Sequence, residues 1–374
     1  MADALDLDLQ RLVDAADDAA LLRAVDGLCA SRQWDALEEL ARRCRDAVEV
    51  GKQLWGVAMH IDYRLAWEGP APHAGRAVTP GAGRFTLGPL TEVAASAHTW
   101  ADLAPHLEEP ASRAAVAQER VLRGEDLTGE DVEAELPLRL ADFEPDYALP
   151  SYRDRTARFP APAAAATPTV AARDLPAGRS RALDEAGKAL HDVVEVWGTE
   201  SSGRVRVATA EGDGPAAVSR FGARARLVEI DHRDALALLQ WAGASGGAAG
   251  RRRGGAAGRF AAWWALAALA GLEWDDDHDA LAGDLGDAVA ELRFWRWAPE
   301  PTEAGSEAGA RTGGVLEADR GGVGWAEPSG NGGPEHGWVL RLAVADPLDD
   351  LAWAIDAYDT AEPDGRLSSL ATGR

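Results

Sequence analysis

Cysteine and lysine are nearly absent from this sequence of 374 residues. Cys29 and Cys44 are the only cysteines, so a disulfide framework is excluded and a reducing compartment is favoured, which predicts a cytoplasmic protein. Lys52 and Lys188 are the only lysines, and almost every positive charge is therefore arginine. We attribute the arginine bias, and the richness in alanine and glycine, to GC-rich coding rather than to function.

Long apolar runs are also missing. The first residues, MADALDLDLQ, are acidic and lack the apolar segment of a secretory signal. The longest apolar run, residues 260–272, is too short to span a bilayer. We therefore expect a soluble protein that does not enter membranes.

Positive charge is scarce overall but concentrated in one place. The formal net charge is −24, which disfavours general binding of nucleic acids or anionic membranes because the long-range field repels polyanions. Residues 1–136 carry 25 acids and 13 bases, and residues 273–374 carry 22 acids and 7 bases. Residues 220–259, with 3 acids and 8 bases, form a basic island between them.

The common catalytic and cofactor motifs do not occur. The sequence has no GxxxxGK[ST] phosphate loop, no GxSxG nucleophile elbow and no HExxH zinc motif, and its glycine-rich residues 75–85 do not match GxGxxG after a strand. We therefore expect no cofactor, and the balance favours a protein that is not an enzyme.

The chain divides into three parts by composition and periodicity. Residues 1–136 show apolar positions three and four apart, which predicts helical hairpins in a solenoid-like or irregular bundle, with a glycine- and proline-rich loop after Gly69. Residues 137–180 contain seven prolines and are expected to form a linker or arm, part of which packs through its aromatic residues. Residues 181–374 are expected to form an α+β domain with a small mixed sheet packed by helices.

Four strands and several helices are expected in that third part. The strands are predicted at 204–210, 224–230, 292–297 and 338–344, and helices at 181–197, 231–241 and 276–292. A glycine-rich segment at 298–336 follows, and whether it is ordered is left open. A final helix is expected to start at Asp346 or Asp349 and to run to Tyr358.

The most distinctive stretch is residues 245–272, in which glycines and three arginines run into the longest apolar segment. Gly246, Gly250, Gly254 and Gly258 are four apart, so in a helix they would form a flat stripe for close packing. Alternatively the glycines form a loop and the helix starts near Ala256, where its N-terminus favours an anion. Whether the part before Ala256 is helix or loop stays open.

The arginines of this stretch are the leading candidates for a binding site. Arg251, Arg252, Arg253 and Arg259 are predicted to contact an anion or a partner protein, against the alternative that they pair with acids of this same chain.

Two weaker sites follow. Trp295 and Trp297 alternate on one strand and are candidates for stacking a flat ligand, unless they belong to the core. Asp275, Asp277 and Asp279 are weak metal candidates, because consecutive helical residues point in different directions and acids in a first helical turn explain them better.

These observations favour a protein-interaction, scaffold or accessory subunit, in which the helical N-terminal part binds a protein partner. The alternative is an enzyme or effector directed at nucleotides or nucleic acids, with the arginines at 251–253 contacting phosphate. The sequence carries no signal for the oligomeric state.

Overall fold

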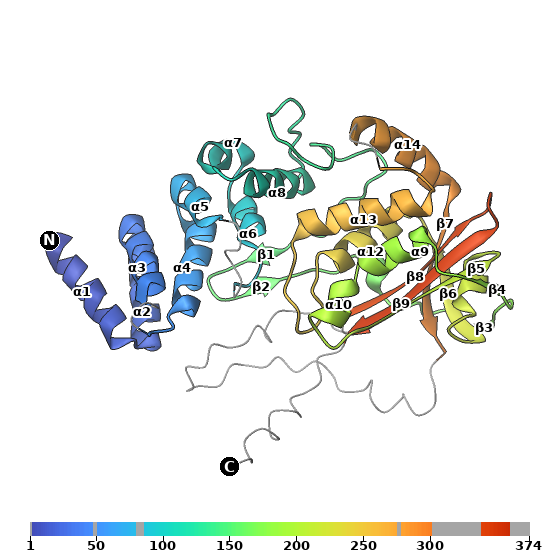
Figure 1. The fold of residues 1–374 in the computed structure, drawn as a ribbon, viewed down its shortest axis with the longest axis horizontal. Helices are drawn as coiled ribbons and strands as arrows, with labels where there is room; N and C mark the ends of the chain where they lie inside the picture. The colour runs from blue at the N-terminus through green and yellow to red at the C-terminus, as the bar shows by residue number, and fades with distance from the viewer. Residues whose placement is uncertain (1, 48–50, 80–85, 275–277, 301–337, 360–374) are drawn as a thin grey trace, which may run out of the picture.

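The computed structural model describes residues 2–47, 51–79, 86–274, 278–300 and 338–359. It combines helices with an antiparallel sheet, so the mixed α+β class is confirmed. Figure 1 shows the first helices side by side at one end of the molecule and the sheet at the other. None of the helices in the described ranges has both the length and the apolar character that crossing a bilayer requires.

The N-terminal part consists of short helices that pack through buried apolar residues. They are α1 (Ala2–Ala15), α2 (Asp18–Ala30), α3 (Trp34–Asp46), α4 (Trp55–Glu68), α5 (Ala71–Ala77), α6 (Leu90–Ala97), α7 (Trp100–Leu103) and α8 (Pro110–Leu122). In α3 the stripe is Leu37, Leu40, Ala41 and Cys44, and it packs against α2 and α4. Periodicity of three and four predicted helices in this part of the sequence, and the structure has them, with α5 as an addition that the pattern did not predict.

Helix α5 occupies a segment that the sequence predicted to be a loop. Gly69 and Pro70 end α4, but Pro70 also precedes the first turn of α5, where a missing N–H is harmless. Gly75 of α5 has no room for a side chain, because an added Cβ would lie 2.7 Å from the carbonyl oxygen of His106. Glycine here permits close packing of the chain rather than a turn, and the prediction of a loop was wrong for residues 71–77.

The proline-rich residues 137–180 pack against both the N-terminal helices and the C-terminal part. They contain the hairpin of β1 (Ser151–Tyr152) and β2 (Ala157–Arg158), and the short 3₁₀ helix η3 (Ala163–Ala165). Their aromatic side chains Phe143, Tyr147, Tyr152 and Phe159 are all buried. As expected from those aromatics, part of this segment packs on its neighbours.

The C-terminal part contains one seven-stranded antiparallel sheet. Its strands are β3 (Arg173–Asp174), β4 (Arg179–Arg181), β5 (Arg204–Glu211), β6 (Arg224–Ile230), β7 (Arg293–Pro299), β8 (Trp338–Asp346) and β9 (Leu351–Asp359). They lie in the order β3-β6-β7-β8-β9-β5-β4. The helices of this part are α9 (Glu185–Asp192), α10 (Glu195–Thr199), α11 (Gly214–Val218), α12 (His232–Gly243), α13 (Gly255–Leu269) and α14 (His278–Glu291).

The last described element is strand β9, not the helix that the sequence predicted through Tyr358. β9 pairs with β8 on one side and β5 on the other, so it is a central strand. Because both faces of a central strand are covered, its apolar residues run almost without interruption and no alternation marks it. Asp350, with φ of 52°, ends the tight connection from β8. The predicted glycine-rich segment 298–336 lies almost wholly outside the described residues.

The two faces of the sheet carry different cores. Helices α9 and α12 cover one face and α13 packs on them, so that Trp263 and Leu266 join Phe294, Leu342 and Ile355 in the largest cluster. The other face carries α11 and a cluster of alanines with Trp295 and Trp297. Helix α13 thus lies between the sheet core and the N-terminal helices, since it also contacts α8.

Candidate functional site

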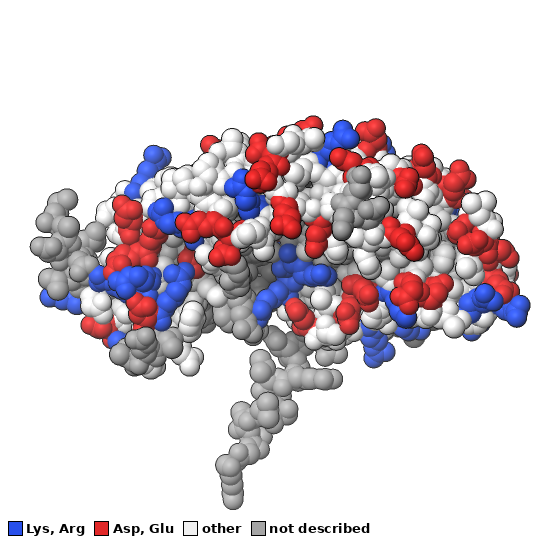
Figure 2. All heavy atoms as spheres, turned by 45° about the horizontal axis from the view of Figure 1, so that its top comes forward, with Lys and Arg blue, Asp and Glu red and all other residues white. Residues whose placement is uncertain are grey.

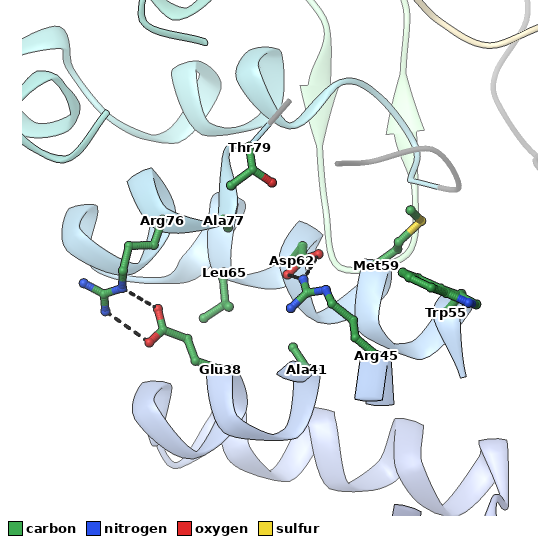
Figure 3. A pocket seen from close by; sticks show the side chains of 10 residues that line it. All are labelled: Glu38, Ala41, Arg45, Trp55, Met59, Asp62, Leu65, Arg76, Ala77 and Thr79. Carbon is green, nitrogen blue, oxygen red and sulfur yellow. Dashed lines mark hydrogen bonds and ion pairs between the residues drawn. The ribbon is translucent and has the colours of Figure 1, made fainter. Parts of the chain in front are cut away.

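A surface pocket lies among α3, α4 and α5 (Figure 3). Its volume is about 440 Å³. Ten residues line it, namely Glu38, Ala41, Arg45, Trp55, Met59, Asp62, Leu65, Arg76, Ala77 and Thr79. Trp55 is 44% exposed although it is a large apolar residue, and Met59 lies beside it. Trp55 and Met59 therefore form an apolar wall of the pocket that is open to solvent.

Two ion pairs line the same pocket. Arg45 pairs with Asp62, which is almost buried, and burial raises the pKa of Asp62 although the charge of Arg45 opposes this effect. Arg76 donates from Nε and Nη2 to the two oxygens of Glu38, at 3.0 and 3.1 Å. Because each charge is already paired, the pocket offers no free charge to a substrate, and its apolar wall is the part open for contact.

A group of possible metal ligands lies next to the pocket. Asp35, Glu38 and His73 place one ligand atom each within 4.8 Å of one another. However, Arg76 donates to both oxygens of Glu38 and lies 3.0 Å from Nδ1 of His73. A guanidinium therefore already takes the acceptors that a metal ion would need, and we interpret the group as ion pairing.

The glycine- and arginine-rich stretch is a loop followed by a helix, which is the second of the two alternatives for residues 245–272. Gly254, with φ of 102°, is the N-cap of α13, and the helix begins at Gly255. Close packing is nevertheless real at Gly258, where an added Cβ would lie 2.2 Å from the carbonyl oxygen of Gln240 in α12. Gly246 and Gly250 belong to the loop instead.

Carboxylates from the N-terminal helices occupy the start of α13. The N–H of Gly255 donates to Glu92 of α6 at 3.0 Å, and the N–H of Ala256 donates to Glu119 of α8 at 2.7 Å. Arg252 donates to both oxygens of Glu92 at 2.7 Å, and its guanidinium lies 4.5 Å from the ring of Phe159. The anion expected at this helix N-terminus is thus supplied by the chain itself.

The two carboxylates are both buried but have opposite pKa shifts. For Glu119, burial and the nearby charge of Glu92 raise the pKa, although Arg123 donates to it at 2.7 Å. For Glu92, burial also acts to raise the pKa, but the paired Arg252 and the hydroxyl of Tyr152 outweigh it and lower the pKa. The surroundings therefore favour the ionised form of Glu92 and disfavour the ionised form of Glu119.

Arg259 forms a second buried ion pair. Its guanidinium donates to both oxygens of Glu144 at 2.8 and 2.6 Å, to the side chain of Gln118, and to the carbonyls of Pro137 and Arg139. Burial would raise the pKa of Glu144, but the hydrogen bonds and charge of Arg259 hold it below its usual value. Arg259 is completely buried, so the structure does not present it to an external anion.

The remaining arginines of the stretch are at the surface. Arg251 and Arg253 are exposed in the loop before α13. Figure 2 shows lysine and arginine atoms gathered near the middle of one face, with acidic residues to both sides. The four arginines therefore do not converge: two contact acids of this chain inside the protein, and two lie outside.

Trp295 and Trp297 are brought together on one face of β7, but inside the core. They are 4% and 2% exposed. Phe221 stacks on Trp297 at 5.4 Å, and the indole N–H of Trp297 donates to the carbonyl of Ile355 at 3.2 Å. This geometry supports core packing, with no open face for a flat ligand.

Of the three weak metal candidates, Asp275 and Asp277 lie outside the described residues. Asp279 is exposed in the first turn of α14, where a negative charge is favourable at a helix N-terminus.

A family model matches residues 19–301, well over half of the chain. The chain belongs to the family of unknown function DUF6183. In this DUF6183 protein the matched span runs from α2 to β7 and includes both the pocket at Trp55 and the buried ion pairs around α13. Searches of curated proteins and of solved structures found no significant match.

The sequence patterns identified the arginines near α13 in this DUF6183 protein but not the acids that contact the start of α13. Glu92 lies beside Val93 and Ala94 in the buried part of α6, and Glu119 lies among Val116, Ala117 and Val121 of α8. A carboxylate on an otherwise apolar helix face signals a buried ion pair, and this signal was present in the sequence. The pocket had no comparable signal, because its residues come from three helices and one of these was expected to be a loop.

Proposed function

We propose that this protein is a protein-interaction or accessory subunit that binds a partner protein through its N-terminal helical part. The observation that carries the proposal is the pocket at Trp55. Exposed tryptophans and methionines in a pocket are typical of residues that dominate binding energy at protein interfaces. The pocket volume of about 440 Å³ is sufficient for one or two large side chains of a partner.

The placement of charge supports the same interpretation. The arginines at 252 and 259 and the acids Glu92, Glu119 and Glu144 contact one another in the interior, where a substrate has no access. The paired charges around Trp55 resemble the polar rim of an interface. Since residues 1–136 have an excess of acids, we expect the partner surface to be basic.

The proposed organisation has three parts: helical residues 1–136 for partner binding, the packed arm 137–180, and the α+β residues 181–374. Contacts of α2 with α3, α3 with α4 and α4 with α5 support successive helical hairpins in the first part. We also propose a cytoplasmic location, supported by the two free thiols. Burial raises the pKa of Cys29 to about 11 and that of Cys44 to about 12, so neither forms a reactive thiolate.

The experiment is affinity purification from the native host with the wild-type protein, Trp55→Ala and Leu183→Ala. Leu183 is 45% exposed, so it is the matched control for an exposed apolar residue. We expect a stoichiometric partner with wild type and Leu183→Ala, and its loss with Trp55→Ala. Equal recovery with Trp55→Ala, from a variant that is folded, would contradict the proposal.

The alternative function, phosphate contact by the basic island, retains only part of its support. Arg252 and Arg259 already bind Glu92 and Glu144, and of the four arginines only Arg251 and Arg253 are exposed. We expect filters carrying the protein to retain no labelled nucleotide, DNA or RNA at low salt. Retention that disappears with Arg251→Glu and Arg253→Glu would favour the alternative.

A further inference from the structure

An aromatic cluster lies on the outer side of α13, away from the pocket at Trp55. It consists of Phe260 and Trp264 of α13, Trp274 of the following connection, and His278 at the start of α14. The ring centroids of Trp264 and Trp274 are 5.3 Å apart, and those of Phe260 and Trp274 are 5.4 Å apart. Trp264 is 42% exposed, and the other three residues are partly exposed.

No cation of the described residues is found over the rings of this cluster. Arginines of this chain do lie over several other aromatic rings, such as those of Trp100, Phe159 and Trp263, with the guanidinium 4.5 to 5.4 Å from the ring centroid. Among the described residues no arginine or lysine lies over Phe260, Trp264 or Trp274. Their ring faces carry the negative potential that attracts a cation, and this potential is unused within the described part of the chain.

The sequence around the cluster is acidic. Residues 272–292 contain no lysine or arginine. Among the described residues of this range, five acids are exposed, namely Glu273, Asp279, Asp284, Asp287 and Glu291. Within the described ranges none of these acids forms an ion pair, whereas most exposed arginines on the sheet do. Acidic side chains are also widespread over the face drawn in Figure 2.

One polar atom of the cluster has no partner among the described residues. Nδ1 of His278 is buried and makes no hydrogen bond there. Such an atom gains a hydrogen bond when a polar ligand covers it. In the described part of the chain the cluster therefore combines aromatic faces without a cation, acids without an ion pair and an imidazole nitrogen without a hydrogen bond.

We propose that this surface, Phe260, Trp264, Trp274 and His278 with the acids beside them, binds an arginine-bearing segment of a protein partner. A guanidinium stacks on tryptophan more favourably than an ammonium does, and the acids attract its charge. A polyanion is repelled by the same acids, and a neutral ligand makes no use of them. The proposal does not rest on the pocket at Trp55, which lies on different helices.

The test is fluorescence anisotropy with a labelled eight-residue peptide of alternating glycine and arginine, added to the full chain at about 0.1 M salt. Peptides with lysine, with glutamine and with proline in place of arginine are compared. We expect the arginine peptide to bind most tightly and the glutamine peptide not to bind. Equal binding of the glutamine peptide, or tighter binding of the proline peptide, would overturn the proposal.

Variants separate this site from general attraction by the acidic protein. Trp264→Ala keeps the net charge, and we expect it to weaken binding of the arginine peptide about three- to tenfold. Leu183→Ala, a change at an exposed apolar residue of nearly equal exposure, is expected to stay within about twofold of wild type. Wild-type affinity in Trp264→Ala, or an equal loss in Leu183→Ala, would overturn the assignment to α13.

A second variant makes the test independent of how Trp264→Ala folds. Asp279→Asn alters only an exposed charge beside His278, in the first turn of α14. We expect weaker binding of the arginine peptide and a shallower dependence of its affinity on salt. Unchanged affinity and unchanged salt dependence would contradict the role of the acids.

Discussion

At the scale of single residues, the burial of charge decides what the arginines of the basic island do. Arg252 and Arg253 are neighbours in sequence, yet one pairs with Glu92 inside the protein and the other is exposed. Removing one member of a buried ion pair leaves the other charge without compensation, which is costly. Removing an exposed arginine has little effect.

Arg259→Ala is therefore expected to destabilise the protein by about 3–5 kcal/mol, because it leaves Glu144 buried and unpaired. The measurement is the free energy of unfolding in urea. Arg253→Ala, at an exposed arginine with no ion pair in the described part of the chain, should change it by no more than about 0.5 kcal/mol. Similar values for the two variants would show that the Arg259 pair has no structural role.

Glu119 predicts a pH dependence with a defined sign. Its folded-state pKa is raised, so the native state binds its proton more tightly than the unfolded chain does. The stability it contributes is complete below the unfolded pKa of about 4.3 and is lost as the pH rises through the folded pKa. We expect the stability of wild type relative to Glu119→Gln to fall with rising pH above that point, in urea titrations at several pH values. A difference that rises or stays flat would contradict the shift.

The scale of elements is set by α13, which packs against α12, α9 and α8. Gly258 allows its close approach to α12, since an added Cβ would meet the carbonyl oxygen of Gln240. Gly283 in α14 has no atom within 4 Å of the corresponding position. Both glycines therefore lie inside helices, but only Gly258 is tightly packed against a neighbour.

We expect Gly258→Ala to destabilise the protein by about 1–3 kcal/mol through overpacking. Gly283→Ala should stabilise it by about 0.5–1 kcal/mol, because alanine is the better helix former. Thermal unfolding of both variants measures the contrast. If Gly258→Ala were as stable as Gly283→Ala, α12 and α13 would not pack as closely as the structure shows.

The elements that the sequence predicted are those whose pattern is local. Alternation positioned β5 to β8 within about two residues at their ends, and periodicity of three and four positioned the helices of the first part. Strand β9 was missed because both of its faces are buried, and α5 because glycine and proline there serve packing. Local patterns do not report either circumstance.

The candidate site was less predictable than the fold for a related reason. The arginines were identified, but their acceptors lie far away in sequence: Glu92 is 160 residues from Arg252, Glu119 is 137 from Ala256 and Glu144 is 115 from Arg259. No spacing rule connects positions so distant. The sequence offered pairing with acids of the same chain as an alternative, and only the fold identifies those acids.

At the scale of the whole molecule, the start of α13 connects the N-terminal helices to the sheet. Glu92 of α6 and Glu119 of α8 bind its first N–H groups, and Glu144 of the proline-rich arm binds Arg259 within it. All three carboxylates come from residues before 181 and all their donors on α13 come after it. The basic island of the sequence is therefore the point at which the acidic halves of the chain are held together.

A double-mutant cycle between Arg252 and Glu92 tests this account most directly. The free energy of unfolding is measured for wild type, Arg252→Met, Glu92→Gln and the double variant. Because each single change leaves a buried partner unsatisfied while the double change removes both charges, we predict a coupling energy of about 2–3 kcal/mol. A coupling energy below about 0.5 kcal/mol would contradict the claim that the glycine- and arginine-rich segment holds an anion of its own chain.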